Sequence, residues 1–311
     1  MKNNNNTLIV LLILSLLFTQ QISADEIKKV YKVGFAQDTM SNDWRVAQVN
    51  EMKAALEPYP FIQFIHSDAK GKALRQIHDL QMLDKQGVDI LVTSPRDRAA
   101  MTPVIERLNR KKPVVLLSRK PLKNEFTSFV GANDRAIARE AAKLIAKKLN
   151  GKGRVVMING VMTATTAIER ENGFVNELNN YPGIEIVAAP VADYRRDKAI
   201  IEMDKLLKQK LEFDAIFAHS DSMASGARMA MERAGLDAGD YVIVGIDYIP
   251  EAKEAIIKGK QTASFTYPTA GAEGAEIVLK LIRGENVDKY VDVPFTLVTI
   301  ENVHQVPTIF K

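Results

Sequence analysis

Polar and aromatic side chains follow several short apolar runs in the first half of this 311-residue chain. The segment Gln37 to Arg45 contains two carboxylates, a guanidinium group and the only tryptophan, Trp44. Two later runs are followed by Ser94-Pro95-Arg96 and by Ser118-Arg119. Guanidinium groups donate paired hydrogen bonds, and aromatic rings cover the apolar face of a bound molecule. These residue types indicate recognition of a small polar ligand.

The second half of the chain shows the same arrangement of polar residues after apolar runs. The segments concerned are Thr163 to Arg170, Asp193-Tyr194-Arg195, His219-Ser220-Asp221 and Asp247-Tyr248. Carboxylates and guanidinium groups pair with vicinal hydroxyls, and rings pack against the C–H face of a sugar. The two halves together favour a polyhydroxylated ligand.

Enzyme motifs are not found in the sequence. The four histidines, His66, His78, His219 and His304, are far apart and lack the H-E-x-x-H spacing of a zinc site, and the chain has no cysteine for thiolate chemistry. No G-x-S-x-G or G-x-x-x-x-G-K-[ST] sequence is present, and Gly151-Lys152-Gly153 lacks the third glycine of a dinucleotide fingerprint. We therefore expect a binding protein with no catalytic residue, no metal and no cofactor.

The elements that position these residues alternate between strands and helices. Apolar and β-branched runs predict strands, whereas the segments between them carry apolar residues at helical spacing, as at Ile137, Ala141 and Leu144. Continuous apolar strands separated by amphipathic helices are typical of parallel sheets covered on both faces. The predicted strands are 30–36, 61–66, 90–93, 114–117, 155–158, 184–187, 215–218, 242–246 and 263–266.

Two such units fit the length of the chain, and we expect two doubly wound, Rossmann-like α/β lobes. The first takes residues 25–131 plus about 268–296, and the second takes 132–267 plus about 297–311. Several short crossings between the lobes make a multi-strand hinge. Ligands of open parallel sheets bind beyond the carboxyl ends of the strands, where the polar segments described above occur.

The N-terminal sequence has the features of an export signal. Lys2 precedes an eleven-residue apolar run, Leu8 to Phe18, and then Ile22-Ser23-Ala24, a small-residue cleavage sequence. A membrane anchor is the alternative, but the run is shorter than the roughly 20 apolar residues needed to span a bilayer. We expect cleavage after Ala24, leaving a soluble protein in the periplasm.

The charge balance argues against a nucleic-acid partner. Lys and Arg number 42 against 38 Asp and Glu, a formal net charge of +4 with the basic residues scattered. We expect a monomer that binds a small molecule.

Several segments carry a resemblance to a known family. They are Val33 to Gln37 with Asp43-Trp44-Arg45, Val115 to Arg119, Ala167 to Phe174, Ala218 to Ala227 and Val244 to Asp247. In this order and spacing the mature chain resembles the type I periplasmic binding proteins for sugars, most closely their galactofuranose- and ribose-binding branch. The resemblance implies a closing two-lobed fold that delivers its ligand to an ABC permease.

The resemblance also implies roles for individual residues. Trp44 and Arg45 match the aromatic ring and the guanidinium group of the family's first loop. Arg119 matches the Arg of the family's Asp-Arg pair, and Arg170 matches the Arg of its Arg-x-x-Gly-Phe helix start. Tyr194 matches the aromatic residue that closes over the sugar. Asp221 matches the Asp of the family's Asn-Asp pair, and Asp247 matches the carboxylate of its Gly-x-Asp sequence. With the strand-end residues, the candidate ligand residues are Asp43, Trp44, Arg45, Arg96, Arg119, Arg170, Tyr194, Ser220, Asp221, Asp247 and Tyr267.

Three departures from the family pattern leave the ligand's charge open. Ser118 stands where the family has Asp, Ser220 where it has Asn, and Tyr267 where ribose binders tend to have Gln. One interpretation is that the ligand is an acidic sugar, because five arginines occur near strand ends: Arg45, Arg96, Arg119, Arg170 and Arg195. The other is that two or three of these arginines neutralise Asp43, Asp221 and Asp247 around a neutral furanose.

Structural roles and other partners remain open at this point. Trp44 could be a packing residue, and Arg45 and Arg195 could be charged side chains exposed to solvent. Arg170 could form a structural ion pair with Glu171 or Asp221. A transcription factor of the lactose-repressor type would need a helix-turn-helix where this chain has its apolar N-terminus. The closed form could also dock on a sensor histidine kinase or a chemoreceptor instead of a permease.

Overall fold

The apolar runs of the sequence form two six-stranded β-sheets in the computed structural model, which describes residues 29–309. The expected signal peptide, residues 1–24, lies outside the described residues. From Tyr31 onward the described chain forms one compact unit that contains both sheets. We call each sheet with its helices a lobe.

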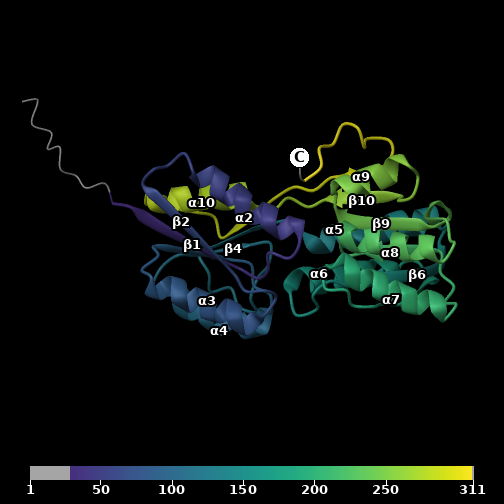
Figure 1. Cartoon of the computed structure of the whole chain (residues 1–311), viewed down its shortest axis with the longest axis horizontal. Coiled ribbons are helices and arrows are strands. Elements are labelled where there is room, and N and C mark those ends of the chain that lie inside the picture. The colour runs from purple at the N-terminus through teal and green to yellow at the C-terminus, as the bar shows by residue number, and fades with distance from the viewer. Residues whose placement is uncertain (1–28, 310–311) are drawn as a thin grey trace, which may run out of the picture. The chain divides into compact units, whose positions relative to one another are not determined.

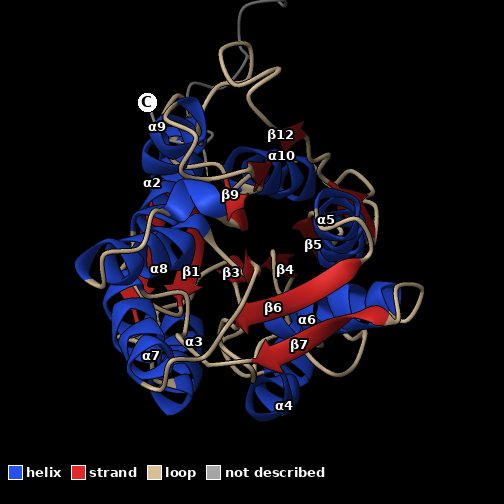
Figure 2. Cartoon of the chain, turned by 90° about the vertical axis from the view of Figure 1, so that its right-hand side faces the viewer, coloured by secondary structure: helices blue, strands red, loops and turns tan. Residues whose placement is uncertain are grey.

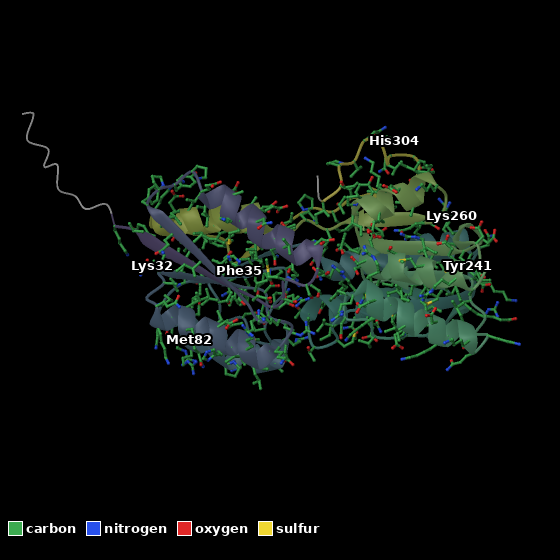
Figure 3. All side chains as sticks on the ribbon, in the orientation of Figure 1. Lys32, Phe35, Met82, Tyr241, Lys260 and His304 are labelled. Atoms are coloured by element: carbon green, nitrogen blue, oxygen red, sulfur yellow. The ribbon has the colours of Figure 1, made fainter. Side chains whose placement is uncertain are left out.

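The sheet of the first lobe has the order β11-β5-β4-β3-β1-β2, and every pairing in it is parallel. Phe35, on β1, is fully buried between the helix layers of this lobe (Figure 3). The strands are β1 (Tyr31–Gln37), β2 (Ile62–Asp68), β3 (Ile90–Thr93), β4 (Val114–Leu117), β5 (Ser128–Gly131) and β11 (Tyr290–Asp292).

Helices cover both faces of this sheet, as Figure 1 shows. α2 packs with α10 on one face, and α3 packs with α4 on the other. Buried side chains of α2 and α10 form one core cluster with the strands, while those of α3 and α4 form another. The helices are α2 (Asp43–Leu56), α3 (Ala73–Lys85), α4 (Arg98–Asn109) and α10 (Gly271–Ile282).

The sheet of the second lobe has the order β12-β10-β9-β8-β6-β7. Its pairings are parallel except for β12, which runs antiparallel to β10. Figure 2 shows helices around these strands; α5 packs with α6, and α7 packs with α8.

The strands of this lobe are β6 (Lys152–Ile158), β7 (Gly183–Ala188), β8 (Ala215–Ala218), β9 (Val242–Asp247), β10 (Ala263–Thr266) and β12 (Leu297–Val298). The helices are α5 (Asp134–Lys148), α6 (Thr165–Leu178), α7 (Arg196–Lys208), α8 (Asp221–Arg233), the short 3₁₀ helix η1 (Ala238–Asp240) and α9 (Pro250–Ile257).

Within the described chain, three short segments run from one sheet to the other. They lie between β5 and α5, between β10 and α10, and between β11 and β12. Each spans only a few residues, as a hinge requires. The sheets therefore group the strands of 31–131 with β11, and those of 152–266 with β12. The exact lobe boundaries given above stay predictions.

All nine predicted strands are present, with ends that shift by a few residues. Three further strands, β5, β11 and β12, were not predicted. β5 offers only Phe129 and Val130 as apolar residues, and the other two span three and two residues. Such short runs carry no periodic signal.

Among residues 29–309, no helix combines the length and apolarity needed to cross a bilayer. In the same range, no group of three or more His, Asp or Glu side chains is arranged to hold a metal ion.

Candidate functional site

A pocket lies where the carboxyl ends of strands from both lobes face each other. It encloses about 410 Å³ of empty space, which includes space open to solvent. We call it the inner pocket. Its lining is Asn42, Trp44, Arg45, Ser118, Arg119, Thr166, Arg170, Tyr194, Ser220, Ser222, Asp247 and Tyr267.

The first turn of α2 delivers two of the lining residues. The Asn42 side chain caps this helix by accepting a hydrogen bond from the Arg45 backbone N–H at 2.9 Å. The Trp44 indole N–H donates to the Tyr267 carbonyl at 3.0 Å, and the two rings lie 5.6 Å apart. The Arg45 guanidinium lies 4.7 Å from the centre of the Trp44 ring. Trp44 therefore lines the pocket and also contacts the segment that crosses between the lobes.

A buried carboxylate that the sequence analysis did not single out, Asp38, holds the arginines of the first lobe. Its oxygens lie 2.8 Å from Arg119, 3.2 Å from Arg45 and 3.7 Å from Arg96. Burial opposes ionisation of Asp38, but the three guanidinium groups outweigh it and hold its pKa below the ordinary value. Burial, with repulsion from Arg119, lowers the Arg45 pKa to about 10. These arginines therefore have a charge partner inside the protein.

Arg170 is the corresponding cation of the second lobe. Its Nε donates to Asp134 at 2.7 Å, and its Nη1 donates to the His219 carbonyl. Its guanidinium lies 4.4 Å from the ring centre of Tyr267, whose hydroxyl donates to Asp134 at 3.2 Å. Burial tends to lower the Arg170 pKa, but Asp134, together with Tyr194, Tyr267 and Asp247, outweighs it and raises that pKa. The structural partner of Arg170 is Asp134, not Glu171 or Asp221.

Tyr194 reaches the pocket from an unusual turn. Asp193 and Tyr194 both have positive φ, 53° and 63°, in the left-handed region that L residues seldom adopt. The Tyr194 hydroxyl lies 2.9 Å from the Thr166 hydroxyl. Gly160 supports the ring, because a Cβ at that position would lie 2.1 Å from the Tyr194 ring carbon Cζ. The turn and the glycine together hold the ring at the pocket.

Asp247, the last residue of β9, presents a carboxylate without a partner. It is 8% exposed, and no hydrogen bond or ion pair joins its side chain to any described residue. Burial raises its pKa well above the ordinary value; Arg170 opposes this and Asp221 adds to it. A buried, unpaired carboxylate facing a pocket is a strong acceptor for ligand hydroxyls.

Three candidate residues lie outside the lining of the inner pocket. Asp43 is exposed at the start of α2. Arg96 lines a neighbouring cavity, and its backbone N–H donates to the Gln76 side chain at 3.0 Å. Asp221 is fully buried and accepts hydrogen bonds from its own lobe.

Eight of the eleven candidates do lie together: Trp44, Arg45, Arg119, Arg170, Tyr194, Ser220, Asp247 and Tyr267. Four lining residues were not candidates. Asn42, Thr166 and Ser222 are small polar residues near helix starts, and Ser118 was noted only as a departure from the family pattern.

Hydrogen bonds join the two lobes along one side of the cleft. The Arg98 N–H donates to the Thr163 carbonyl at 2.8 Å, and the Thr163 hydroxyl donates to the Arg96 carbonyl at 3.2 Å. The Lys120 N–H donates to the Thr165 hydroxyl at 2.9 Å. The lobes are therefore in contact in this structure.

Comparison with known proteins identifies the family. A family model for the periplasmic binding protein domain matches residues 33–286. The chain belongs to this family. Among the relatives of this periplasmic binding protein, the galactofuranose-binding protein of Escherichia coli is 30% identical over 241 residues, covering 75% of this chain and 76% of the relative. The ribose import binding protein of Salmonella typhimurium is 29% identical over 234 residues, covering 74% and 78%.

Solved structures of the family share the fold. The fructose-binding periplasmic domain of a hybrid two-component system superposes with a TM-score of 0.84 and 29% identity, covering 88% of this chain and 92% of that domain. The predicted two-lobed α/β fold and family resemblance are confirmed. The named relatives are binding proteins.

Proposed function

We propose that this periplasmic binding protein captures a sugar or sugar-like small molecule in the inner pocket by closure of its two lobes. The observation that carries the proposal is Asp247, a buried carboxylate with no partner among the described residues, facing a pocket whose other charges are paired. Hydroxyl groups of a ligand would supply the missing donors. The rings of Trp44, Tyr194 and Tyr267 offer faces for the C–H surface of a sugar.

Closure follows from the placement of the lining residues. Trp44, Arg45 and Arg119 come from the first lobe, whereas Arg170, Tyr194 and Asp247 come from the second. A ligand that contacts both sets is held only when the lobes meet, so binding shifts the equilibrium toward the closed form. No group of the protein needs to change covalently, in keeping with a non-enzymatic role.

The ligand-loaded form would then deliver its cargo to an ABC permease in the membrane. We propose that residues 1–24 direct export and are removed after Ala24, and that the mature protein acts as a monomer. N-terminal sequencing of the exported protein tests the cleavage site. Light scattering with and without ligand tests the oligomeric state.

A signalling partner is the second candidate, because the fructose-binding relative is the periplasmic domain of a hybrid two-component system. In that case the closed form docks on a sensor kinase. Ligand-dependent stimulation of the ATPase activity of a permease in vesicles favours transport, whereas ligand-dependent kinase autophosphorylation favours signalling.

A thermal-shift screen tests the binding function. Pentoses, hexoses in furanose and pyranose forms, and cyclic polyols are each added to the mature protein. We expect at least one to raise the melting temperature, because a ligand that binds only the folded state stabilises it. Small-angle scattering should then show compaction on addition of that ligand. If no sugar or polyol stabilises the protein at millimolar concentration, the proposal is wrong.

A further inference from the structure

The inner pocket has no surplus of positive charge. Three guanidinium groups and three carboxylates belong to it or pair with its arginines. They are Arg45, Arg119 and Arg170 against Asp38, Asp134 and Asp247. An anionic group placed there would face the Asp247 carboxylate without an unpaired cation to offset it. The charges of the inner pocket therefore fit a neutral sugar ring.

A second cavity adjoins the inner pocket, and we call it the vestibule. It encloses about 900 Å³ of empty space, including space open to solvent. The first lobe lines it with Thr39, Met40, Ser41, Asn42, Asp68, Lys70, Gly71 and Arg96, and the second with Asp193, Arg195 and Lys198. Asn42 lines both cavities. Tyr194 lines the inner pocket, whereas its neighbours Asp193 and Arg195 line the vestibule. The two cavities therefore meet at Asn42 and at the turn around Tyr194, which a substituent on a ligand in the inner pocket would pass to reach the vestibule.

The vestibule is also the open side of the cleft. Near Thr163 and Thr165 the lobes are joined by the hydrogen bonds described above. No hydrogen bond between described residues joins the two walls of the vestibule. The vestibule therefore leaves space for a group that bridges its two walls.

Cations lie on both walls of the vestibule. Lys70 and Arg96 stand on the first lobe, and Arg195 and Lys198 stand on the second. Lys70 makes no ion pair with a described residue, and Arg96 is the most distant of the three arginines around Asp38.

Nearby acids cancel the cations of the second wall but not all of those on the first. Asp68 lines it and accepts hydrogen bonds from the backbone N–H groups of Met40 and Lys70 at 3.1 and 2.8 Å. Asp193 pairs with Lys198, and Arg195 pairs with Asp197, outside the vestibule lining. With Asp197 counted as the partner of Arg195, the four cations face three acids, which leaves a surplus of one positive charge, on the wall of Lys70 and Arg96.

We propose that the vestibule holds an anionic substituent, a carboxylate or phosphate, carried by a sugar whose neutral ring lies in the inner pocket. The inference rests on the proposed function. The anionic group would pair with Lys70 and Arg96 on one wall and with Arg195 and Lys198 on the other, and so adds contacts across the cleft only in the closed form. The protein would therefore prefer an acidic or phosphorylated sugar over its neutral counterpart.

Calorimetry with matched pairs of sugars tests this preference. D-ribose is compared with D-ribose 5-phosphate, D-glucose with D-glucose 6-phosphate, and D-galactose with D-galacturonate, each at low and high salt. Inorganic phosphate alone distinguishes a free anion from one attached to a sugar. We expect one anionic sugar to bind about tenfold more tightly than its neutral partner, with an advantage that shrinks at high salt because exposed charges are screened.

A double variant from the two walls locates the effect. Lys70→Gln with Arg195→Gln should remove most of the anionic advantage and leave the affinity of the neutral sugar unchanged. Lys85→Gln with Lys205→Gln is the matched control, since it removes one charge from each lobe outside the vestibule.

Four results would overturn the inference. The vestibule would be excluded as an anion site if neutral sugars bound as tightly as their anionic partners, or if the double variant kept the anionic advantage. The proposed function would stand in both cases. Tight binding of inorganic phosphate alone would show that a free anion, and not a sugar substituent, occupies the vestibule. Failure of every sugar to bind would overturn both proposals.

Discussion

The carboxylate of Asp221 accepts a hydrogen bond of 2.7 Å from the backbone N–H of Tyr248. It also accepts hydrogen bonds from the Ser264 hydroxyl at 2.5 Å and the Gln261 amide at 2.7 Å. Gly245 leaves the necessary space, because a Cβ there would lie 1.9 Å from Asp221 Oδ1. A residue at the start of α8 thus fixes the peptide that follows the unpaired carboxylate of Asp247.

Asp221 should give the protein a pH-dependent stability. Burial raises its pKa to about 6, although its hydrogen bonds oppose the shift. The folded state then keeps a proton that the unfolded chain loses near pH 4, so the free energy of unfolding falls as pH rises from about 4 to about 6. The shift of roughly two units corresponds to about 3 kcal/mol.

Urea denaturation across this pH range measures the effect. The difference in unfolding free energy between the protein and its Asp221→Asn variant should change by about 2 to 3 kcal/mol between pH 4 and pH 7. Asp204→Asn, which breaks a more exposed ion pair with Arg233, is the control. A constant difference would show that Asp221 titrates as in an unfolded chain.

Asp38 should be essential to the stability of the first lobe. Its replacement by Ala leaves Arg45 and Arg119 buried without their shared counter-charge. Removing one partner of a buried ion pair typically costs about 3 to 5 kcal/mol. Chemical denaturation of Asp38→Ala measures this loss, and Asp197→Ala, from an exposed pair with Arg195, should cost less than about 1 kcal/mol. Equal stability of the two variants would contradict the role assigned to Asp38.

Gly160→Ala should weaken ligand binding by displacing the Tyr194 ring. The new Cβ would lie 2.1 Å from that ring, far inside van der Waals contact. We expect the affinity for the sugar found in the screen to fall at least about tenfold, since Tyr194 lines the inner pocket. Gly153→Ala is the control, because its Cβ would meet the end of the flexible Leu149 side chain at 2.9 Å, away from the pocket lining. A wild-type affinity for Gly160→Ala would remove Tyr194 from the ligand contacts.

Trp44 should report ligand binding by its fluorescence. It is the only tryptophan, lines the inner pocket and lies beneath the Arg45 guanidinium. A ligand against the ring changes its surroundings, so emission should shift or change in intensity on titration. Trp44→Phe serves as the blank. An unchanged spectrum, with binding confirmed by calorimetry, would favour a packing role for Trp44.

Most of the scaffold could be predicted because long, continuous apolar runs leave few alternatives to buried parallel strands. Residues 114–117 and 215–218 are four-residue runs that form strands at the predicted positions. β5 could not be predicted, since Ser128 and Gly131 flank its two apolar residues and it is a strand only through pairing with β4 and β11. Tertiary pairing decided the conformation of this segment.

Charge partners were harder to predict than pocket positions. The sequence indicated that Arg119 and Arg170 follow strands or begin helices, and both line the inner pocket. It gave no sign that Asp38 binds Arg119 across 81 positions, or that Asp134 binds Arg170 across 36. Such pairings depend on where loops meet in space, which neither periodicity nor local propensity encodes.

The central claim is that Asp247 accepts hydrogen bonds from the ligand, and calorimetry of Asp247→Asn tests it most directly. Asn keeps the size of the side chain but removes the charge that ligand hydroxyls would meet, and the loss of a charged partner in a buried site costs about 2 to 5 kcal/mol. We predict that the affinity for the sugar identified in the screen falls at least about 30-fold, while the variant stays folded in circular dichroism. An affinity within threefold of wild type would contradict the claim.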